Sequence, residues 1–396
     1  MSVYPVTEID PRNERDMTAV DRLLADEGLR RDRHLDFICG MYDDGGSLIA
    51  TGSLYRATLR CMAVSGAHRG EGLLNSVISF LTEKAVSSGY SHLFVCTKYD
   101  TALFFKDVGF YEIATVRDTI SFLENKRGAF FAYLDALEEA AARKTGANIG
   151  DSGTSVPDRQ SAECTGIISA IVMNANPFTL GHQFLVEQAS RESSLVHLFL
   201  VSEDESVFPF SVRKKLVTEG TKHLENVILH DSGPYMISNA TFPSYFQKDD
   251  AAVTRSHAAI DAAVFLKIAQ RLKITRRYVG EEPFSETTNL YNEVLGTMLP
   301  EAGVALAVVP RKTVQGREIS ASGVRALIRE DTFAPGGSAP VAHDGNGEEA
   351  DAAHLSDACR KTLAHLVPPA TLAFLASEEG RRVIAAVKEQ HDVNHH

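Results

Sequence analysis

The sequence predicts an α/β protein with two domains, the second built on a parallel sheet. At 396 residues the chain exceeds what one hydrophobic core usually holds, since single domains run to about 100 to 200 residues. From about residue 164 to 330, apolar strand-like runs alternate with amphipathic helical segments. Such alternation is typical of a parallel sheet with helices on both faces and ligands at the carboxyl ends of the strands.

Composition excludes several classes of function. A formal net charge of -12 and a pI near 5.6 argue against non-specific nucleic-acid binding, which needs a basic face. The first 17 residues lack the basic and apolar regions of a signal peptide, and no apolar run approaches the roughly 18 residues of a membrane span. Five scattered cysteines indicate no disulfide framework. We therefore expect a soluble, cytoplasmic protein without nucleic-acid or membrane partners.

The first half begins with a short amphipathic helix around residues 17–29. Apolar and polar residues then alternate on both sides of Asp43-Asp44-Gly45-Gly46, which predicts a β-hairpin. A further strand, residues 57–66, leads into a loop that contains Arg69, Gly70 and Gly72, and a helix follows from residue 73. A strand, a basic glycine-containing loop and a helix together indicate a phosphate-binding turn.

The basic loop and a later helix that stops at Gly109-Phe110 resemble the GNAT acetyltransferase fold. In that family an Arg-x-x-Gly-x-Gly/Ala loop binds the pyrophosphate of acetyl-CoA, which implies cofactor contacts at Arg69, Gly70 and Gly72. Leu74 departs from the pattern, because it replaces the final glycine or alanine. Two functions remain open for this domain. It could bind a CoA-like group without transfer, or transfer acetyl with one of three unranked proton acceptors, Glu71, Tyr99 or Tyr111.

Changes in amino-acid composition along the chain predict the domain boundaries. We predict a GNAT-like domain at residues 1–145, a Gly/Ser/Asp-rich linker at 146–163, a nucleotide-binding domain at 164–330, a disordered insertion at 331–354, and C-terminal helices at 355–396 that pack on the nucleotide domain.

The stretch of residues 167–182 is the predicted centre of the chemistry. A buried strand ends at Asn174, Asn176 and Pro177, and a helix begins near Gly181 and His182, so backbone amides face the strand end as in anion sites. The Thr-x-Gly-His ending resembles the (His/Thr)-x-Gly-His motif of the nucleotidylyltransferase superfamily. This resemblance implies that the turn binds ATP and that Thr179 and His182 are catalytic. It also implies that five residues of the turn contact the nucleotide: Asn174, Asn176, Pro177, Phe178 and Gly181.

A second motif, residues 319–325, resembles the Ile-Ser-Ser/Thr-x-x-Arg motif of the same superfamily. Ser320 or Ser322 can cap the following helix. The resemblance implies that Ser320 and Ser322 bind the nucleotide and that Arg325 is catalytic. Arg325, with Ser320 and the exposed amides, is expected to hold the β- and γ-phosphates and later the leaving pyrophosphate.

Two further sets of residues complete the expected site. Superfamily members carry a basic residue after the second strand, which implies a catalytic role for Arg213 and, next, Lys214, although lysines on a solvated helix face are also common. They also bind the base and ribose at a Gly-x-Asp/Glu at a later strand end, which implies adenosine contacts at Gly280 and Glu281.

Four blocks together resemble the citrate lyase ligase family: residues 174–182, 232–246, 280–284 and 319–325. The resemblance implies an acid-thiol ligase that uses ATP and acetate, passes through acetyl adenylate and acetylates a thiol. That thiol belongs to the CoA-derived prosthetic group on the acyl-carrier subunit of citrate lyase. Magnesium is expected to bridge the phosphates, but no acidic cluster in the sequence indicates its ligands.

Two other functions fit the same motifs. An adenylyltransferase would use the same ATP site to make a dinucleotide or a pantetheine-type product, although such enzymes usually have histidine where this chain has Thr179. A non-catalytic regulator that binds CoA or a carrier would need neither His182 nor Arg325 as donors to a transition state.

Overall fold

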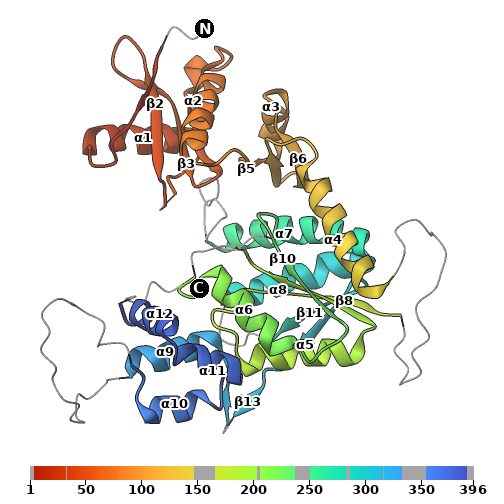
Figure 1. Cartoon of the computed structure of the whole chain (residues 1–396). Coiled ribbons are helices and arrows are strands. Elements are labelled where there is room, and N and C mark those ends of the chain that lie inside the picture. Colours follow the sequence, from red (N-terminus) through yellow and green to blue (C-terminus); the bar gives the residue numbers. More distant parts are fainter. Residues whose placement is uncertain are drawn as a thin grey trace, which may run out of the picture. The chain divides into compact units, whose positions relative to one another are not determined.

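The computed structural model of the chain (Figure 1) describes residues 4–32, 34–146, 166–202, 206–236, 250–281, 286–314, 316–331 and 354–389. Most of the predicted linker and insertion, and most of the block at residues 232–246, lie outside these residues. The described residues form two compact units. Unit 1 takes in those within Met1–Ala136, Ile237–Ile268 and Leu290–Met298, and unit 2 takes in the rest.

Unit 1 contains a seven-stranded sheet in the order β1-β2-β3-β4-β5-β7-β6. Its strands are β1 (Val6–Glu8), β2 (Phe37–Tyr42), β3 (Leu48–Tyr55), β4 (Thr58–Val64), β5 (Phe94–Lys98), β6 (Tyr111–Val116) and β7 (Ile120–Glu124). The β4/β5 pair is parallel, and all other pairs are antiparallel. Its main helices are α1 (Glu14–Asp26), α2 (Leu73–Ser87) and α3 (Ala102–Asp107), with one-turn helices η1 (Gly66–His68) and η2 (Tyr99–Thr101).

Local sequence explains how this sheet is built. The predicted hairpin is confirmed: Gly46 has a φ of 77°, and the backbone amide of Asp43 donates to the carbonyl of Ser47 at 3.0 Å. A Cβ atom at Gly52 on β3 would lie 2.5 Å from a methyl group of Val77 on α2. The absence of a side chain at Gly52 therefore lets α2 pack closely on the sheet.

Unit 2 contains a five-stranded sheet in the order β10-β9-β8-β11-β12, and every neighbouring pair is parallel. Its strands are β8 (Ile168–Met173), β9 (Leu195–Leu200), β10 (Val227–Asp231), β11 (Arg276–Gly280) and β12 (Ala305–Val309). The predicted α/β fold with a parallel second sheet is confirmed.

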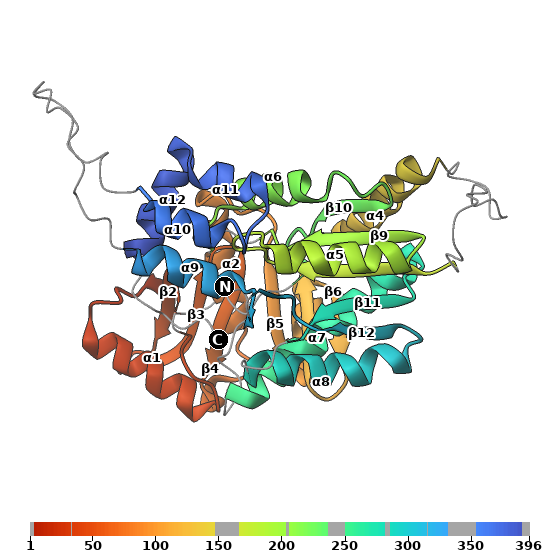
Figure 2. The ribbon, with the colours of Figure 1, turned by 90° about the horizontal axis from the view of Figure 1, so that it is seen from below.

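The remaining helices, from α4 onward, include α5, which lies along the parallel sheet and contacts β9 and β11 (Figure 2). The helices are α4 (Ala129–Thr145), α5 (Leu180–Glu192), α6 (Phe210–Thr221), α7 (Asp250–Leu272), α8 (Glu286–Glu301), α9 (Ala321–Glu330), α10 (Asp357–Leu363), α11 (Pro369–Leu375) and α12 (Glu378–Glu389). A two-stranded hairpin of β13 (Thr313–Val314) and β14 (Arg317–Glu318) lies between β12 and α9. By residue range, α4, α7 and α8 are each divided between the two units.

The last four helices, α9 to α12, form one group (Figure 1), and their buried apolar residues share one core with β8 and β9. Gly380 explains the close packing of α12 on α11, because a Cβ atom there would lie 2.0 Å from the carbonyl oxygen of Phe374. Within the described residues, no helix has the length and apolar character needed to cross a membrane.

Candidate active site

The loop that joins β8 to α5, residues 174–179, packs against α6. Ala175 has a φ of 52°, and the Asn176-Pro177 peptide bond is cis. Phe178 is fully buried, and a Cβ atom at Gly220 on α6 would lie 2.3 Å from its ring. Because no larger residue fits at Gly220, the Phe178 ring anchors the loop against α6.

Thr179 and His182 form a reciprocal cap at the start of α5. The Thr179 hydroxyl accepts from the backbone amide of His182 at 3.3 Å, and the imidazole Nδ1 accepts from the amide of Thr179 at 3.1 Å. Since Nδ1 is an acceptor, a neutral imidazole carries its proton on Nε2. Burial, with a smaller contribution from the charge of Arg311, lowers the pKa of His182 to about 4. At neutral pH this residue is therefore an uncharged N–H donor.

The α9 helix begins next to this cap. Ser320 caps α9 by accepting from the amide of Gly323 at 2.9 Å, and its hydroxyl lies 3.2 Å from that of Ser322. A Cβ atom at Gly181 would lie 3.0 Å from the carbonyl oxygen of Ile319. Gly181 thus permits the N-termini of α5 and α9 to approach each other closely, and the two predicted motifs lie against each other.

Two arginines bind carbonyl groups of the loop. Arg325 on α9 donates through Nη1 to the carbonyl of Asn176 at 2.5 Å. Arg213 on α6 is fully buried and donates to the carbonyl of Asn174 at 2.8 Å. It also donates to two other carbonyls, those of Val201 and Phe208. Arg325 therefore lies beside the Thr179–His182 cap, and the contacts of Arg213 support the loop from the interior.

The amide side chains of the loop bind the segment before α6. Asn174 donates to the hydroxyl of Ser206 at 3.0 Å, and the Asn176 side chain accepts from the amide of Phe208 at 3.1 Å. Lys214, the neighbour of Arg213, pairs with Asp231 at 2.7 Å on an exposed part of unit 2.

Gly280 and Glu281 lie at the carboxyl end of β11. The amide of Glu281 donates to the carbonyl of Val309, so the register with β12 continues to this point. A Cβ atom at Gly280 would meet nothing within 4 Å. Among the residues that the structure describes, the backbone at Gly280 therefore borders open space, and its contact with adenosine stays a prediction.

One cation near the site was not predicted from the sequence. Arg311 follows β12, donates through Nε to the carbonyl of Glu281 at 2.7 Å and acts electrostatically on His182. Its position immediately after a parallel strand is the signal that would have identified it, since ligands of such sheets bind at the carboxyl ends of the strands.

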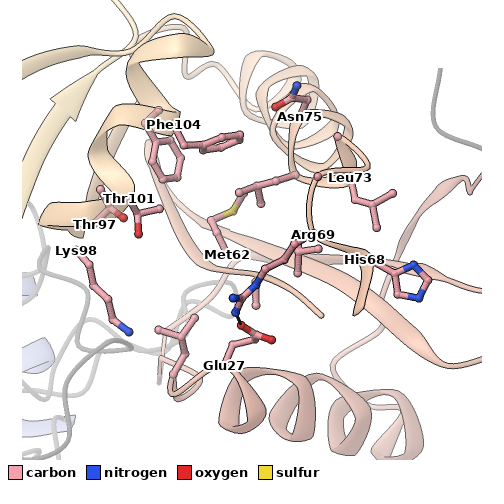
Figure 3. Close-up of a pocket in the computed structure, with 17 residues that line it drawn as sticks. Glu27, Met62, His68, Arg69, Leu73, Asn75, Thr97, Lys98, Thr101 and Phe104 are labelled. Atoms are coloured by element: carbon pink, nitrogen blue, oxygen red, sulfur yellow. Dashed lines mark hydrogen bonds and ion pairs between the residues drawn. The ribbon is translucent and has the colours of Figure 1, made fainter. Parts of the chain in front are cut away.

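Unit 1 contains a separate cavity of about 600 Å³ (Figure 3). The parallel strands β4 and β5 pair only at Thr58–Phe94 and Leu59–Val95, and the residues beyond these pairs line the cavity. The lining consists of residues 62–64 of β4, Thr97 and Lys98 of β5, residues 68–70 and 72–75 around the start of α2, Thr101, Phe104 and Phe105, and Glu27 and Leu29.

The basic loop lies at the mouth of this cavity. Gly70 and Gly72 have φ values of 87° and 74°, which favour glycine, and a Cβ atom at either would meet nothing within 4 Å. Gly72 provides no side-chain cap to α2. The Arg69 guanidinium forms an ion pair with Glu27 (Figure 3). The loop therefore presents helix amides and a cation to the cavity.

The three unranked proton acceptors do not line the cavity. Glu71 pairs with His68 at 3.2 Å, and both Tyr99 and Tyr111 have more than a third of their surface exposed. Leu74 does line it. Among the described residues, no group of three or more His, Cys, Asp or Glu side chains is placed to hold a metal ion.

Comparisons with known proteins cover both units. The sequence model described as Citrate lyase ligase C-terminal domain matches residues 168–335. The citrate (pro-3S)-lyase ligase of Klebsiella pneumoniae is 33% identical over 371 residues, which cover 92% of this chain and 93% of that protein. The corresponding ligase of Escherichia coli is 32% identical over 332 residues, which cover 82% of this chain and 88% of that protein.

Part of the chain is also similar to solved structures. One is a putative acyl-CoA N-acyltransferase from Klebsiella pneumoniae, with 16% identity, a TM-score of 0.27, and coverage of 31% of this chain and 97% of that one. Another is a GNAT-family acetyltransferase from Staphylococcus aureus, with 13% identity, a TM-score of 0.27, and coverage of 31% and 100%. Because these two ligases are more than 30% identical to this protein over most of its length, the chain belongs to the citrate lyase ligase family and is an enzyme.

Proposed function

We propose that this ligase activates acetate with ATP and transfers the acetyl group to the thiol of a CoA-derived prosthetic group on the acyl-carrier subunit of citrate lyase. The observation that carries the proposal is the junction of the α5 and α9 N-termini, where His182, Ser320 and Arg325 lie around one loop. The names of the relatives, which are ligases of citrate (pro-3S)-lyase, support citrate lyase as the partner.

The residues at this junction suit the triphosphate of ATP. Two helix N-termini with converging amides form an environment that favours anions. The Nε2–H of a neutral His182 adds a donor, and the Arg325 guanidinium adds a positive charge next to the loop. Bound magnesium would neutralise phosphate charge.

The proposed reaction has two steps. In the first, an acetate oxygen forms a bond to the α-phosphorus while the bond from that phosphorus to the bridging oxygen breaks, so pyrophosphate leaves and acetyl adenylate forms. In the second, the carrier sulfur attacks the acetyl carbonyl carbon, AMP leaves with its electron pair, and the thiol proton goes to solvent. Acetate, ATP and thiol thus yield thioester, AMP and pyrophosphate.

His182 contributes to the first step in this account. Negative charge on the α-phosphate oxygens grows as the acetate oxygen approaches, and a donor fixed in place before the reaction stabilises that charge without reorganising. The reciprocal cap with Thr179 fixes both the imidazole ring and its tautomer. Arg213 then acts as a positioning residue, because its contacts are to the carbonyls of the loop and its neighbours.

The cavity of unit 1 suits the prosthetic arm. A pantetheine arm is an extended chain with two amide groups, and the diverging strands β4 and β5 offer edges that such a chain can follow. Arg69 and the α2 amides at the mouth suit the phosphates of the arm. Met62, Phe104 and Phe105 supply apolar surface within the cavity.

Isotope exchange tests the proposal. Radiolabelled pyrophosphate should enter ATP in the presence of acetate, because adenylation is reversible, and should not do so without a carboxylic acid. Exchange that instead requires phosphopantetheine would indicate an adenylyltransferase with a pantetheine-type product. No exchange with any partner, from protein that binds ATP, would favour a non-catalytic binding protein.

A further inference from the structure

Two basic residues lie at the base of the β13–β14 hairpin, which connects β12 to α9 beside the proposed nucleotide site. Arg311 and Lys312 lie between the end of β12 at Val309 and the start of β13 at Thr313. The hairpin closes where the amide of Ile319 donates to the carbonyl of Lys312 at 3.0 Å. Since Ile319 is also the neighbour of Gly181, the hairpin base lies against the start of α5.

The contacts of Arg311 fix its side chain at this position. Its Nε donates to the carbonyl of Glu281 at 2.7 Å and lies 3.5 Å from a carboxylate oxygen of Glu318. The Arg311 side chain is only 16% exposed. Arg311 therefore connects the carboxyl end of β11 to the hairpin, and its charge acts on His182.

Lys312 extends the positive charge over α5. Its Nζ lies 5.9 Å from the centroid of the Phe184 ring, one turn into that helix. The two residues approach the α5 N-terminus from the hairpin, whereas Arg325 belongs to α9 and contacts the loop. Cations from two different segments thus lie around the Thr179–His182 cap.

We propose that Arg311, assisted by Lys312, binds the β- and γ-phosphates of ATP and the leaving pyrophosphate, an inference that rests on the proposed function. A triphosphate carries about four negative charges, more than Arg325 alone can balance, and arginine offers five N–H donors that suit phosphate oxygens. Glu318 is the anion that accompanies Arg311 in the described structure. Phosphate oxygens compete with this carboxylate for the guanidinium, and the Glu281 carbonyl keeps the side chain oriented.

Calorimetric titration of the full chain with ATP, inorganic pyrophosphate and AMP tests this inference. Arg311→Gln should weaken ATP and pyrophosphate binding at least tenfold and change AMP binding less than twofold, because AMP lacks both phosphates concerned. Arg311→Lys should recover part of the loss. Arg382→Gln is the matched control, since Arg382 is an exposed arginine of the same unit that also pairs with a glutamate, and it should bind all three ligands normally.

Two outcomes would overturn the inference: unchanged pyrophosphate binding in Arg311→Gln, or an equal loss of AMP and pyrophosphate binding from a protein with an unchanged Tm. The proposed function fails separately. If the wild-type chain binds pyrophosphate through Arg311 but shows no exchange dependent on a carboxylic acid, the phosphate site stands and the ligase proposal does not.

Discussion

At the scale of single residues, the proposed chemistry depends on the protonation state of His182. Its Nδ1 accepts a hydrogen bond from the Thr179 amide, and burial lowers its pKa to about 4. A charged imidazole would need a proton on Nδ1 and would lose this bond. The cap that starts α5 thus also keeps the imidazole neutral, with its donor on Nε2.

Replacing His182 should test this role. We expect His182→Ala to lower the rate of pyrophosphate exchange roughly 100- to 1000-fold, the usual effect of removing one preorganised donor to a transition state. Binding of ATP should change much less. His223→Ala is the control, because His223 is half-exposed and pairs with Glu187 in the same unit. A near-normal exchange rate in His182→Ala would contradict the assignment.

Three histidines that are buried or partly buried also predict how stability depends on pH. Burial lowers the pKa values of His182, His197 and His230 to about 4, 3 and 4, whereas an unfolded histidine titrates near 6.5. Between these values the unfolded chain binds more protons, so the free energy of unfolding should fall as pH falls from 6.5 to 4, by up to about 3 kcal/mol for each histidine.

Urea denaturation between pH 4 and 7 measures this dependence. His197→Gln should make the slope shallower, because it removes a buried histidine that hydrogen bonds to His230 at 2.9 Å. The exposed His223 provides the control, and His223→Gln should leave the slope unchanged. Equal slopes in the wild type and His197→Gln would show that the His197–His230 pair does not contribute to the pH dependence of stability.

At the scale of elements, the C-terminal helices support the loop that joins β8 to α5. The buried hydroxyl of Thr371 on α11 donates to the carbonyl of Phe178 at 3.0 Å. The amide of Leu180, the first residue of α5, donates to the carbonyl of Leu366 at 2.9 Å. The segment 366–371 therefore binds both sides of Thr179, although it lies almost 200 residues later in the chain.

Removing this support should slow the reaction without removing any group that contacts substrate. Thr371→Val leaves a buried carbonyl without its donor, which should cost about 1–3 kcal/mol of stability, and the loop that carries Thr179 should lose precision. We expect a lower kcat for exchange with a smaller change in KM for ATP, and recovery in Thr371→Ser. A loss of stability with unchanged kcat would show that Thr371 contributes to the stability of the fold and not to the reaction.

The sequence predicted long elements better than short ones. The segments with helical or strand periodicity became α2, α5, β8 and β9. The short strands β1, β13 and β14, of two or three residues each, were not predicted, because so few residues show no period. The hairpin base that carries Arg311 was missed for the same reason.

Prediction of the site shows a similar limit. Resemblance to two superfamily motifs predicted roles for Thr179, His182, Ser320 and Arg325, which the structure brings to one junction. It could not show that Arg213 is fully buried, because a charged residue on an amphipathic helix is normally expected in solvent. Only the tertiary structure shows that the guanidinium binds carbonyl groups of the loop.

At the scale of the whole molecule, we propose that unit 2 activates acetate and that unit 1 receives the carrier arm. Each of the two proposed sites combines a helix N-terminus with a basic residue. The two sites belong to units with separate hydrophobic cores. A division of this kind predicts that damage to one site leaves the partial reaction of the other intact.

Arg69→Glu tests the division. The change replaces the cation at the cavity mouth with a carboxylate beside Glu27, so carrier acetylation should fall at least tenfold while acetate-dependent exchange continues. Arg12→Glu is the control, because Arg12 is an exposed arginine of unit 1 that also pairs with a carboxylate. Equal loss of both reactions in Arg69→Glu would argue against a separate role for the cavity.

The central claim, that a carboxylate attacks the α-phosphorus of ATP, can be tested directly with acetate labelled with ¹⁸O in both oxygens. The full chain is incubated with labelled acetate, ATP and hydroxylamine as the acyl acceptor, and AMP is analysed by mass spectrometry. The account predicts one ¹⁸O atom in each AMP formed, because the attacking oxygen stays on phosphorus when the acetyl group leaves. AMP without label, or label in inorganic phosphate, would contradict it.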